Sequence, residues 1–180
     1  MVDEAAFDEL FGRRFDEVRR RAAVPATIAA LDRMRDEARA AVVGLAVPRV
    51  AAHNDLRPKH VIARVEGSDR ERGRLVGLVD WSSLDPRGLP LYDLVHLIAS
   101  ERAQLPGSSP RRAWAEVRDP ARLAPDERAA LEAYERALDL PPAWRAAITA
   151  AYPVLFGAMA ERNWDYSRPR WLRRLYGIGD

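Results

Sequence analysis

The segment His53-Asn54-Asp55-Leu56-Arg57-Pro58-Lys59-His60 leads into a short apolar run, and a second apolar run ends in Val79-Asp80-Trp81. Phosphoryl transfer asks little covalent chemistry of a protein. It needs a carboxylate that orients and deprotonates the attacking hydroxyl, and ligands that hold Mg²⁺ on the phosphates. Asp55 is the candidate for the carboxylate, and His60 and Asp80 are the candidates for the metal ligands.

A hairpin is expected between these motifs. The runs Val61 to Val65 and Leu75 to Val79 are apolar or β-branched, and the polar, Gly-containing stretch 66–73 separates them. Two groups from one loop, faced by a carboxylate across the hairpin, can converge on one ion. The arrangement fits the kinase pattern of a catalytic loop followed by a metal-binding Asp.

The residues before this region have helical patterns. Apolar side chains at three-and-four spacing between Phe7 and Val18 predict an amphipathic helix with Asp3 as its N-cap. A second helix is expected from Pro25 to Val43, ended by Gly44.

The residues after the hairpin are also mainly helical by pattern. We expect helices at Leu91 to Arg102, Pro125 to Leu138, Pro142 to Glu161 and Pro169 to Tyr176. Pro153 should kink or divide the third of these, because proline lacks an amide hydrogen. Residues 104–124 are expected to form a mobile loop with one short turn at Arg111 to Ala115. The expected fold class is α+β, mainly α.

The composition indicates one domain over residues 1–180. It would comprise two helices in 1–48, the catalytic loop, hairpin and metal loop in 49–90, and a helical subdomain in 91–180. With 48% hydrophobic residues the chain can bury a sizeable core. Cysteine is absent and no secretory leader opens the chain, so the cytoplasm is the expected compartment.

The charge pattern bears on the expected partners. The net charge is only +2, and acidic residues alternate with arginine along the helical stretches. No basic stripe with interleaved aromatics is present, and no apolar run reaches the roughly 20 residues of a membrane span. We therefore expect neither nucleic acid nor a membrane as a partner.

The motifs resemble those of the aminoglycoside phosphotransferase and choline-kinase-like family, whose members share the protein-kinase fold. The family pattern is similar to His-Gly-Asp-Leu-x-Pro-x-Asn, a hairpin, Ile-Asp-Trp or Ile-Asp-Phe, and then Asp-Pro-x-Tyr-Asp-Leu. The counterparts here are His53 to His60, Val79 to Trp81, Asp85-Pro86 and Leu91-Tyr92-Asp93-Leu94. The resemblance extends from about Val50 to the C-terminus and implies a protein-kinase-like C-terminal lobe.

The resemblance also implies roles for single residues. Asp55 would be the catalytic base, Asp80 the principal Mg²⁺ ligand, and His53 and Asp93 structural supports of the loop. The implied reaction is transfer of the γ-phosphate of ATP or GTP to a hydroxyl of a small molecule, an aminoglycoside being one candidate.

His60 departs from the family pattern, since most members carry Asn at this position. Mg²⁺ prefers oxygen ligands, so histidine is an uncommon choice. The 2''-type aminoglycoside phosphotransferases are similar to this chain here, with a His-Asn-Asp opening and a histidine closing the loop.

The nucleotide-clamping lobe of the family is expected to be absent. That β-rich lobe supplies a lysine for the phosphates, its partner Glu and a loop over the nucleotide. Here Lys59, the only lysine, lies in the catalytic loop, and the residues before Ala46 read as helices. The chain would then be a fragment or truncated product, or a natural half that is inactive or borrows the lobe from a partner chain.

Two other function classes stay open. A metal-dependent hydrolase would gather His53, Asp55, His60 and Asp80 around Zn²⁺ or Mn²⁺. An inactive kinase-like interaction module would expose an apolar patch where the missing lobe docks. His96, on an apolar helix face, is expected to be structural.

The acceptor is not determined by these motifs. Aminoglycosides are polycations that call for a carboxylate-lined pocket, whereas the helices after Leu91 are rich in arginine. The available carboxylates are Glu101, Asp139, Glu161 and Asp165, and the last two are the candidate substrate-binding residues.

Overall fold

The computed structural model describes residues 1–68, 73–163 and 176–178. These residues form mainly helices, together with small antiparallel sheets. The expected α+β class, mainly α, is confirmed.

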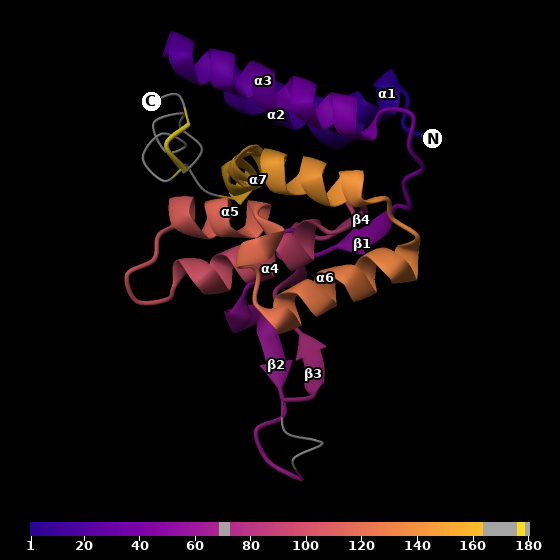
Figure 1. The fold of residues 1–180 in the computed structure, drawn as a ribbon, viewed down its shortest axis with the longest axis vertical. Coiled ribbons are helices and arrows are strands. Elements are labelled where there is room, and N and C mark those ends of the chain that lie inside the picture. The colour runs from indigo at the N-terminus through magenta and orange to yellow at the C-terminus, as the bar shows by residue number, and fades with distance from the viewer. Residues whose placement is uncertain (69–72, 164–175, 179–180) are drawn as a thin grey trace.

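The central element is α7, a helix from Pro142 to Asn163. α2 (Arg13–Arg19) and α3 (Pro25–Val42) pack on one side of it, and α4 (Tyr92–Ala103) and α5 (Pro110–Arg118) pack on the other (Figure 1). The core therefore lies along both sides of α7.

The first helical stretch has three parts. α1 (Glu4–Phe7) is followed by a π-helical turn (Asp8–Gly12) and then by α2. The Asp3 side chain caps it by accepting a hydrogen bond of 2.8 Å from the Ala6 amide. The predicted apolar face is buried, and so the prediction of a capped amphipathic helix is confirmed; its buried members are Phe7, Leu10, Phe11, Phe15 and Val18.

Trp144 on α7 connects this N-terminal layer to the segment that leads into the catalytic loop. Its ring is fully buried and stacks on Phe11 with centroids 6.2 Å apart. Its indole nitrogen donates a 3.0 Å hydrogen bond to the Ala46 carbonyl. Trp144 thus contacts both the helical core and the start of the segment that precedes His53.

Two short antiparallel pairs flank the catalytic loop. β2 (Val61–Ala63) and β3 (Leu75–Leu78) form the predicted hairpin, which projects from the helical body (Figure 1). β1 (Val50–Ala52) pairs with β4 (Asp85–Gly88). This second pair was not predicted, because neither strand has enough residues to show an alternating pattern.

The C-terminal half contains both confirmed and wrong predictions. α4 and α6 (Pro125–Leu138) lie where the patterns placed them. The expected loop at 104–124 is wrong, because α5 occupies its middle, capped by the Ser109 hydroxyl and presenting buried Ala113 and Val117. Pro153 does not divide α7, whose helical hydrogen bonding continues on both sides of it. The expected helix at 169–176 lies outside the described residues except for its last residue.

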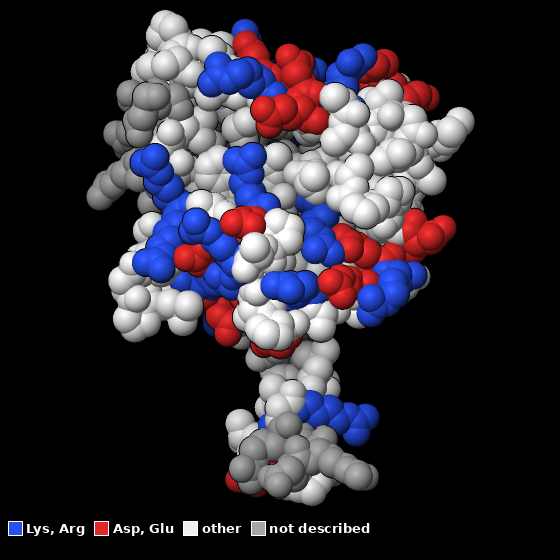
Figure 2. Space-filling model, in the orientation of Figure 1, with Lys and Arg blue, Asp and Glu red and all other residues white. Residues whose placement is uncertain are grey.

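The surface mixes charges of both signs over the helical body (Figure 2). Ion pairs account for part of this pattern, such as Arg102 with Glu116 and Glu127, which joins α4 to α5 and α6. Among the described helices, none has the length and apolar character that a bilayer crossing requires.

Gly88 on β4 is required by the close approach of β1. A Cβ at this position would lie 2.4 Å from the Cβ of Ala52, whereas nothing lies within 4 Å of a Cβ added at Gly77 on β3. We expect Gly88→Ala to lower the free energy of unfolding by about 1–3 kcal/mol through overpacking. Gly77→Ala is the matched control and should change it by less than about 0.5 kcal/mol. Urea unfolding measures both, and equal effects would contradict this account of Gly88.

Candidate active site

The loop after β1 is held by a carboxylate from α4. Asp93 Oδ2 accepts a 2.6 Å hydrogen bond from the His53 amide, and Oδ1 accepts one of 2.7 Å from the Asn54 amide. Asn54 has a φ of 65°, a left-handed conformation that is uncommon outside glycine. Asp93 thus holds a strained turn directly before Asp55. The family resemblance implies the same loop-supporting role for Asp93.

His53 connects this loop to the end of the hairpin. Its Nδ1 accepts a hydrogen bond from the Asp55 amide at 3.3 Å, so its Nε2 carries the proton and donates to the Val79 carbonyl at 2.8 Å. Asp80 is the next residue and has a left-handed φ of 63°. The ring of His53 therefore fixes the distance between the two candidate motifs.

His60 lies between the two candidate carboxylates. Its Nδ1 donates a 2.6 Å hydrogen bond to the Asp55 carbonyl, which leaves the lone pair on Nε2. Nε2 is buried, has no hydrogen-bond partner among the described residues and lies 3.4 Å from Asp80 Oδ2. The two potential ligand atoms, His60 Nε2 and Asp80 Oδ2, thus face each other from opposite sides of the hairpin. The side chain of Asp80 is half exposed.

The donor atoms fit a divalent ion. A neutral imidazole nitrogen and a carboxylate oxygen at this separation can both bind one ion at about 2.0–2.2 Å. The described part of the chain contains no group of three His, Cys, Asp or Glu side chains able to hold a metal. The remaining ligands would be phosphate oxygens and water, as is common for Mg²⁺.

Asp55 receives both of its side-chain contacts on one oxygen. Arg57 Nε donates to Oδ1 at 2.7 Å, and His96 Nε2 lies 3.5 Å from the same atom. Burial opposes ionisation, but His96 and the charge of Arg57 outweigh it and lower the pKa of the Asp55 carboxyl. Asp55 is therefore ionised at neutral pH, and neither contact uses Oδ2.

His96 is a participant that sequence reasoning missed. It is 1% exposed, and burial lowers the pKa of its imidazole despite the opposing effect of Asp55. In the neutral ring, Nδ1 accepts from the Tyr152 hydroxyl at 2.9 Å while the Nε2 proton faces Asp55. Its place one helical turn after Asp93 was the available signal, because residues three apart share a helix face.

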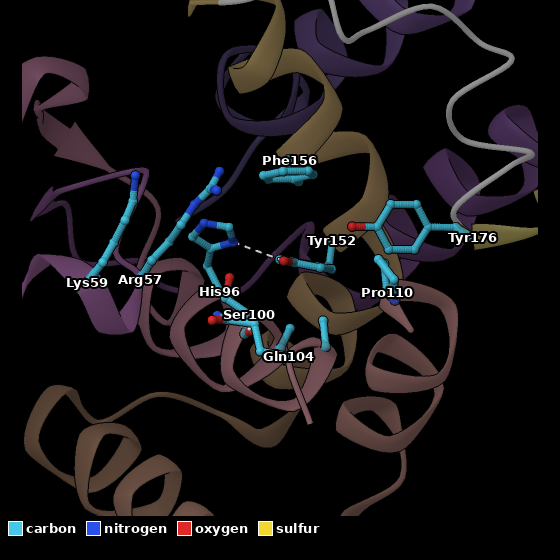
Figure 3. Close-up of a pocket in the computed structure, with 11 residues that line it drawn as sticks. Arg57, Lys59, His96, Ser100, Gln104, Pro110, Tyr152, Phe156 and Tyr176 are labelled. Atoms are coloured by element: carbon cyan, nitrogen blue, oxygen red, sulfur yellow. Dashed lines mark hydrogen bonds between the residues drawn. The ribbon is translucent and has the colours of Figure 1, made fainter. Parts of the chain in front are cut away.

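A pocket of about 420 Å³ opens beside His96, between the catalytic loop, α4, α5 and α7 (Figure 3). Ring systems and short side chains form most of its wall, and two cations border it. The described lining residues are Arg57, Lys59, His96, Ala99, Ser100, Ala103, Gln104, Pro110, Tyr152, Phe156 and Tyr176.

Two of the four candidate carboxylates lie away from this pocket. Glu101 and Asp139 are exposed and are not among the described lining residues. The side chain of Glu161 and all of Asp165 lie outside the described residues.

Comparison with known proteins gives the class of this site. The model of a family described as a phosphotransferase enzyme family, APH, matches residues 3–172. The chain therefore belongs to the APH phosphotransferase family. Neither the curated proteins nor the solved structures contain a match to the chain.

The charge of Arg57 is expected to control the ionisation of Asp55. In Arg57→Gln the pKa of the Asp55 carboxyl should rise, because the nearest positive charge is removed while burial remains. When the pH is lowered, any rate that requires ionised Asp55 would then begin to fall at a higher pH than in the unaltered chain. Carbon NMR of the Asp55 carboxyl measures the shift. Arg136→Gln, an exposed arginine on α6, is the control, and an unchanged pKa in Arg57→Gln would refute the assignment.

The pair of His60 and Asp80 is expected to bind a divalent ion. Mn²⁺ should broaden the NMR signals of both residues, and Asp80→Asn should reduce that broadening at least about tenfold through loss of the charged ligand. Asp85→Asn removes the same charge nearby and should leave the broadening unchanged. His60→Asn should shift the preference from Mn²⁺ toward Mg²⁺, because oxygen replaces nitrogen. Equal broadening in Asp80→Asn and the unaltered chain would rule out this site.

Proposed function

We propose that this chain carries the catalytic region of a small-molecule kinase, which transfers the γ-phosphate of ATP or GTP to a hydroxyl group. The observation that carries the proposal is the double contact of His60. Its Nδ1 binds the backbone of Asp55 and its Nε2 faces the carboxylate of Asp80. A candidate base and a candidate metal ligand are thereby joined through one buried ring, as phosphoryl transfer requires.

Asp55 is the proposed base. Oδ2 accepts the hydrogen bond of the acceptor hydroxyl and then its proton, as the oxygen forms a bond to phosphorus and the bond to the leaving diphosphate breaks. Arg57 bonds Oδ1 and His96 Nε2 faces the same atom at 3.5 Å, and both support the orientation of the carboxylate. When bound between His60 and Asp80, Mg²⁺ supplies positive charge to the phosphate oxygens.

A further part of the proposal concerns the clamp on the nucleotide. Residues 1–49, all described, contain helices and turns, so the strand lysine of the family has no counterpart there. Apolar side chains beside Asp80 are exposed, including Val76 at 62%, Trp81 at 43% and Leu84 at 48%. They support a contact surface for an N-terminal lobe or partner chain that completes the donor site. The likeness of the loop to the 2''-type enzymes stays a prediction.

The hydrolase hypothesis receives less support from the geometry. It requires His53 as a metal ligand, yet both ring nitrogens of His53 already take part in hydrogen bonds. Freeing Nε2 would break the link from the catalytic loop to Val79, and freeing Nδ1 would release the Asp55 amide.

The decisive substitution is Asp55→Asn. With the completing lobe or partner chain, Mg²⁺, ATP or GTP and a panel of hydroxyl compounds, mass spectrometry should detect phosphorylated product. Asp55→Asn should lower the rate by at least about 10²-fold, because an amide cannot accept the proton.

The Mn²⁺ response should persist in Asp55→Asn, which separates loss of the base from loss of the metal site. Asp119→Asn, at an exposed helix cap, is the matched control. Unchanged turnover in Asp55→Asn, or no product with any acceptor once the donor site is completed, would contradict the proposal.

A further inference from the structure

We infer that the pocket beside Asp55 binds a hydroxyl compound with a flat apolar body and an anionic group, and that it disfavours polycations. This inference rests on the proposed function and names the acceptor class for it.

The pocket is placed to deliver a hydroxyl to Asp55. Two of its lining residues, Arg57 and His96, are the two that contact Asp55 Oδ1. A ligand that fills the pocket therefore lies against the same side chains that orient the proposed base. Asp55 is not itself a described lining residue, so the hydroxyl has to extend past these two groups to reach Oδ2.

The walls favour a flat apolar body. His96 stacks on Phe156 with ring centroids 5.2 Å apart, and Tyr152 stacks on Phe156 at 6.1 Å. Tyr176 meets Tyr152 edge to face at 6.3 Å, and Figure 3 shows these rings surrounding one space. Aromatic walls of this kind bind rings through stacking and edge contacts.

The Tyr152 hydroxyl in the same wall is already committed, because it donates to His96 Nδ1. Burial raises the pKa of this hydroxyl well above its ordinary value, so it stays uncharged. A hydrated ligand cannot use this donor to replace the hydrogen bonds of its lost water.

The charges favour an anion. Lys59 and Arg57 extend side by side from the catalytic loop at the pocket edge (Figure 3). Arg57 is engaged by Asp55, whereas no ion pair joins the exposed Lys59 to any described acidic side chain. The described lining contains no Asp or Glu. Among the described lining residues, a polycation would meet Lys59 and no carboxylate to bind it.

The test uses three phenols that share a ring and differ in charge. They are 4-hydroxyphenylacetate as the anion, tyrosol as the neutral alcohol and tyramine as the cation. Calorimetric or NMR titration of the full chain should show the anion binding at least about tenfold tighter than the cation, with the alcohol between them.

Lys59 is the residue that should set this order. Lys59→Gln should weaken binding of 4-hydroxyphenylacetate at least about fivefold, and Lys59→Glu should make tyramine the tighter ligand. Arg33→Gln, an exposed charge on α3 far from the pocket, is the matched control and should leave all three affinities unchanged.

Several results would overturn the inference. One is equal or tighter binding of tyramine to the unaltered chain, and another is no saturable binding of 4-hydroxyphenylacetate. A third is a Lys59→Gln variant that loses affinity for Mn²⁺-ATP but keeps its affinity for the anion, because Lys59 would then serve the donor. These titrations need no turnover, so their failure leaves the Asp55 test of the proposed function intact.

Discussion

The carboxylate of Asp93 is the contact on which the candidate site depends. It accepts two backbone amides from a turn that contains a left-handed Asn54. Burial raises the pKa of the Asp93 carboxyl even though both amide bonds favour its charged form. Asp93 is thus a desolvated carboxylate at the start of α4, and its two hydrogen bonds connect α4 to the catalytic loop that follows β1.

Three buried imidazoles transmit this constraint through the site. The chain has three histidines, and His53, His60 and His96 are all buried around Asp55. A hydrogen bond to one ring nitrogen fixes the proton position on the other in each case. His53 thereby reaches Val79, His60 presents a lone pair to Asp80, and His96 faces Asp55. Three buried rings thus connect the catalytic loop to the end of the hairpin and to α4.

The same arrangement relates the family to its chemistry. Membership in a phosphotransferase family agrees with a loop assembly that carries a candidate base, Asp55, and a candidate pair of metal ligands, His60 and Asp80. The pocket next to that assembly takes its aromatic wall from residues outside the motifs, whereas its two cations, Arg57 and Lys59, belong to the catalytic loop. In our proposal, the reaction type depends on the loop assembly, and the acceptor choice depends on that loop together with the aromatic wall.

The sequence by itself determined the features that local contacts control. A three-and-four apolar spacing predicted the first helical stretch, and two apolar or β-branched runs predicted the hairpin. The motif residues Asp55 and Asp80 were proposed as candidates, because their spacing along the chain is itself the signal. Each of these depends on neighbours within a few residues, and so pattern and propensity suffice to find it.

Only the tertiary structure decided the features that distant residues share. The pairing of β1 with β4, the contact of His96 with Asp55, and the joint wall of α4, α5 and α7 around one pocket all join segments far apart in the chain. The helix α5 was missed because its buried face becomes apparent only against α4 and α7. The physical reason is that burial and hydrogen bonding between such segments depend on how the core packs, which no local pattern encodes.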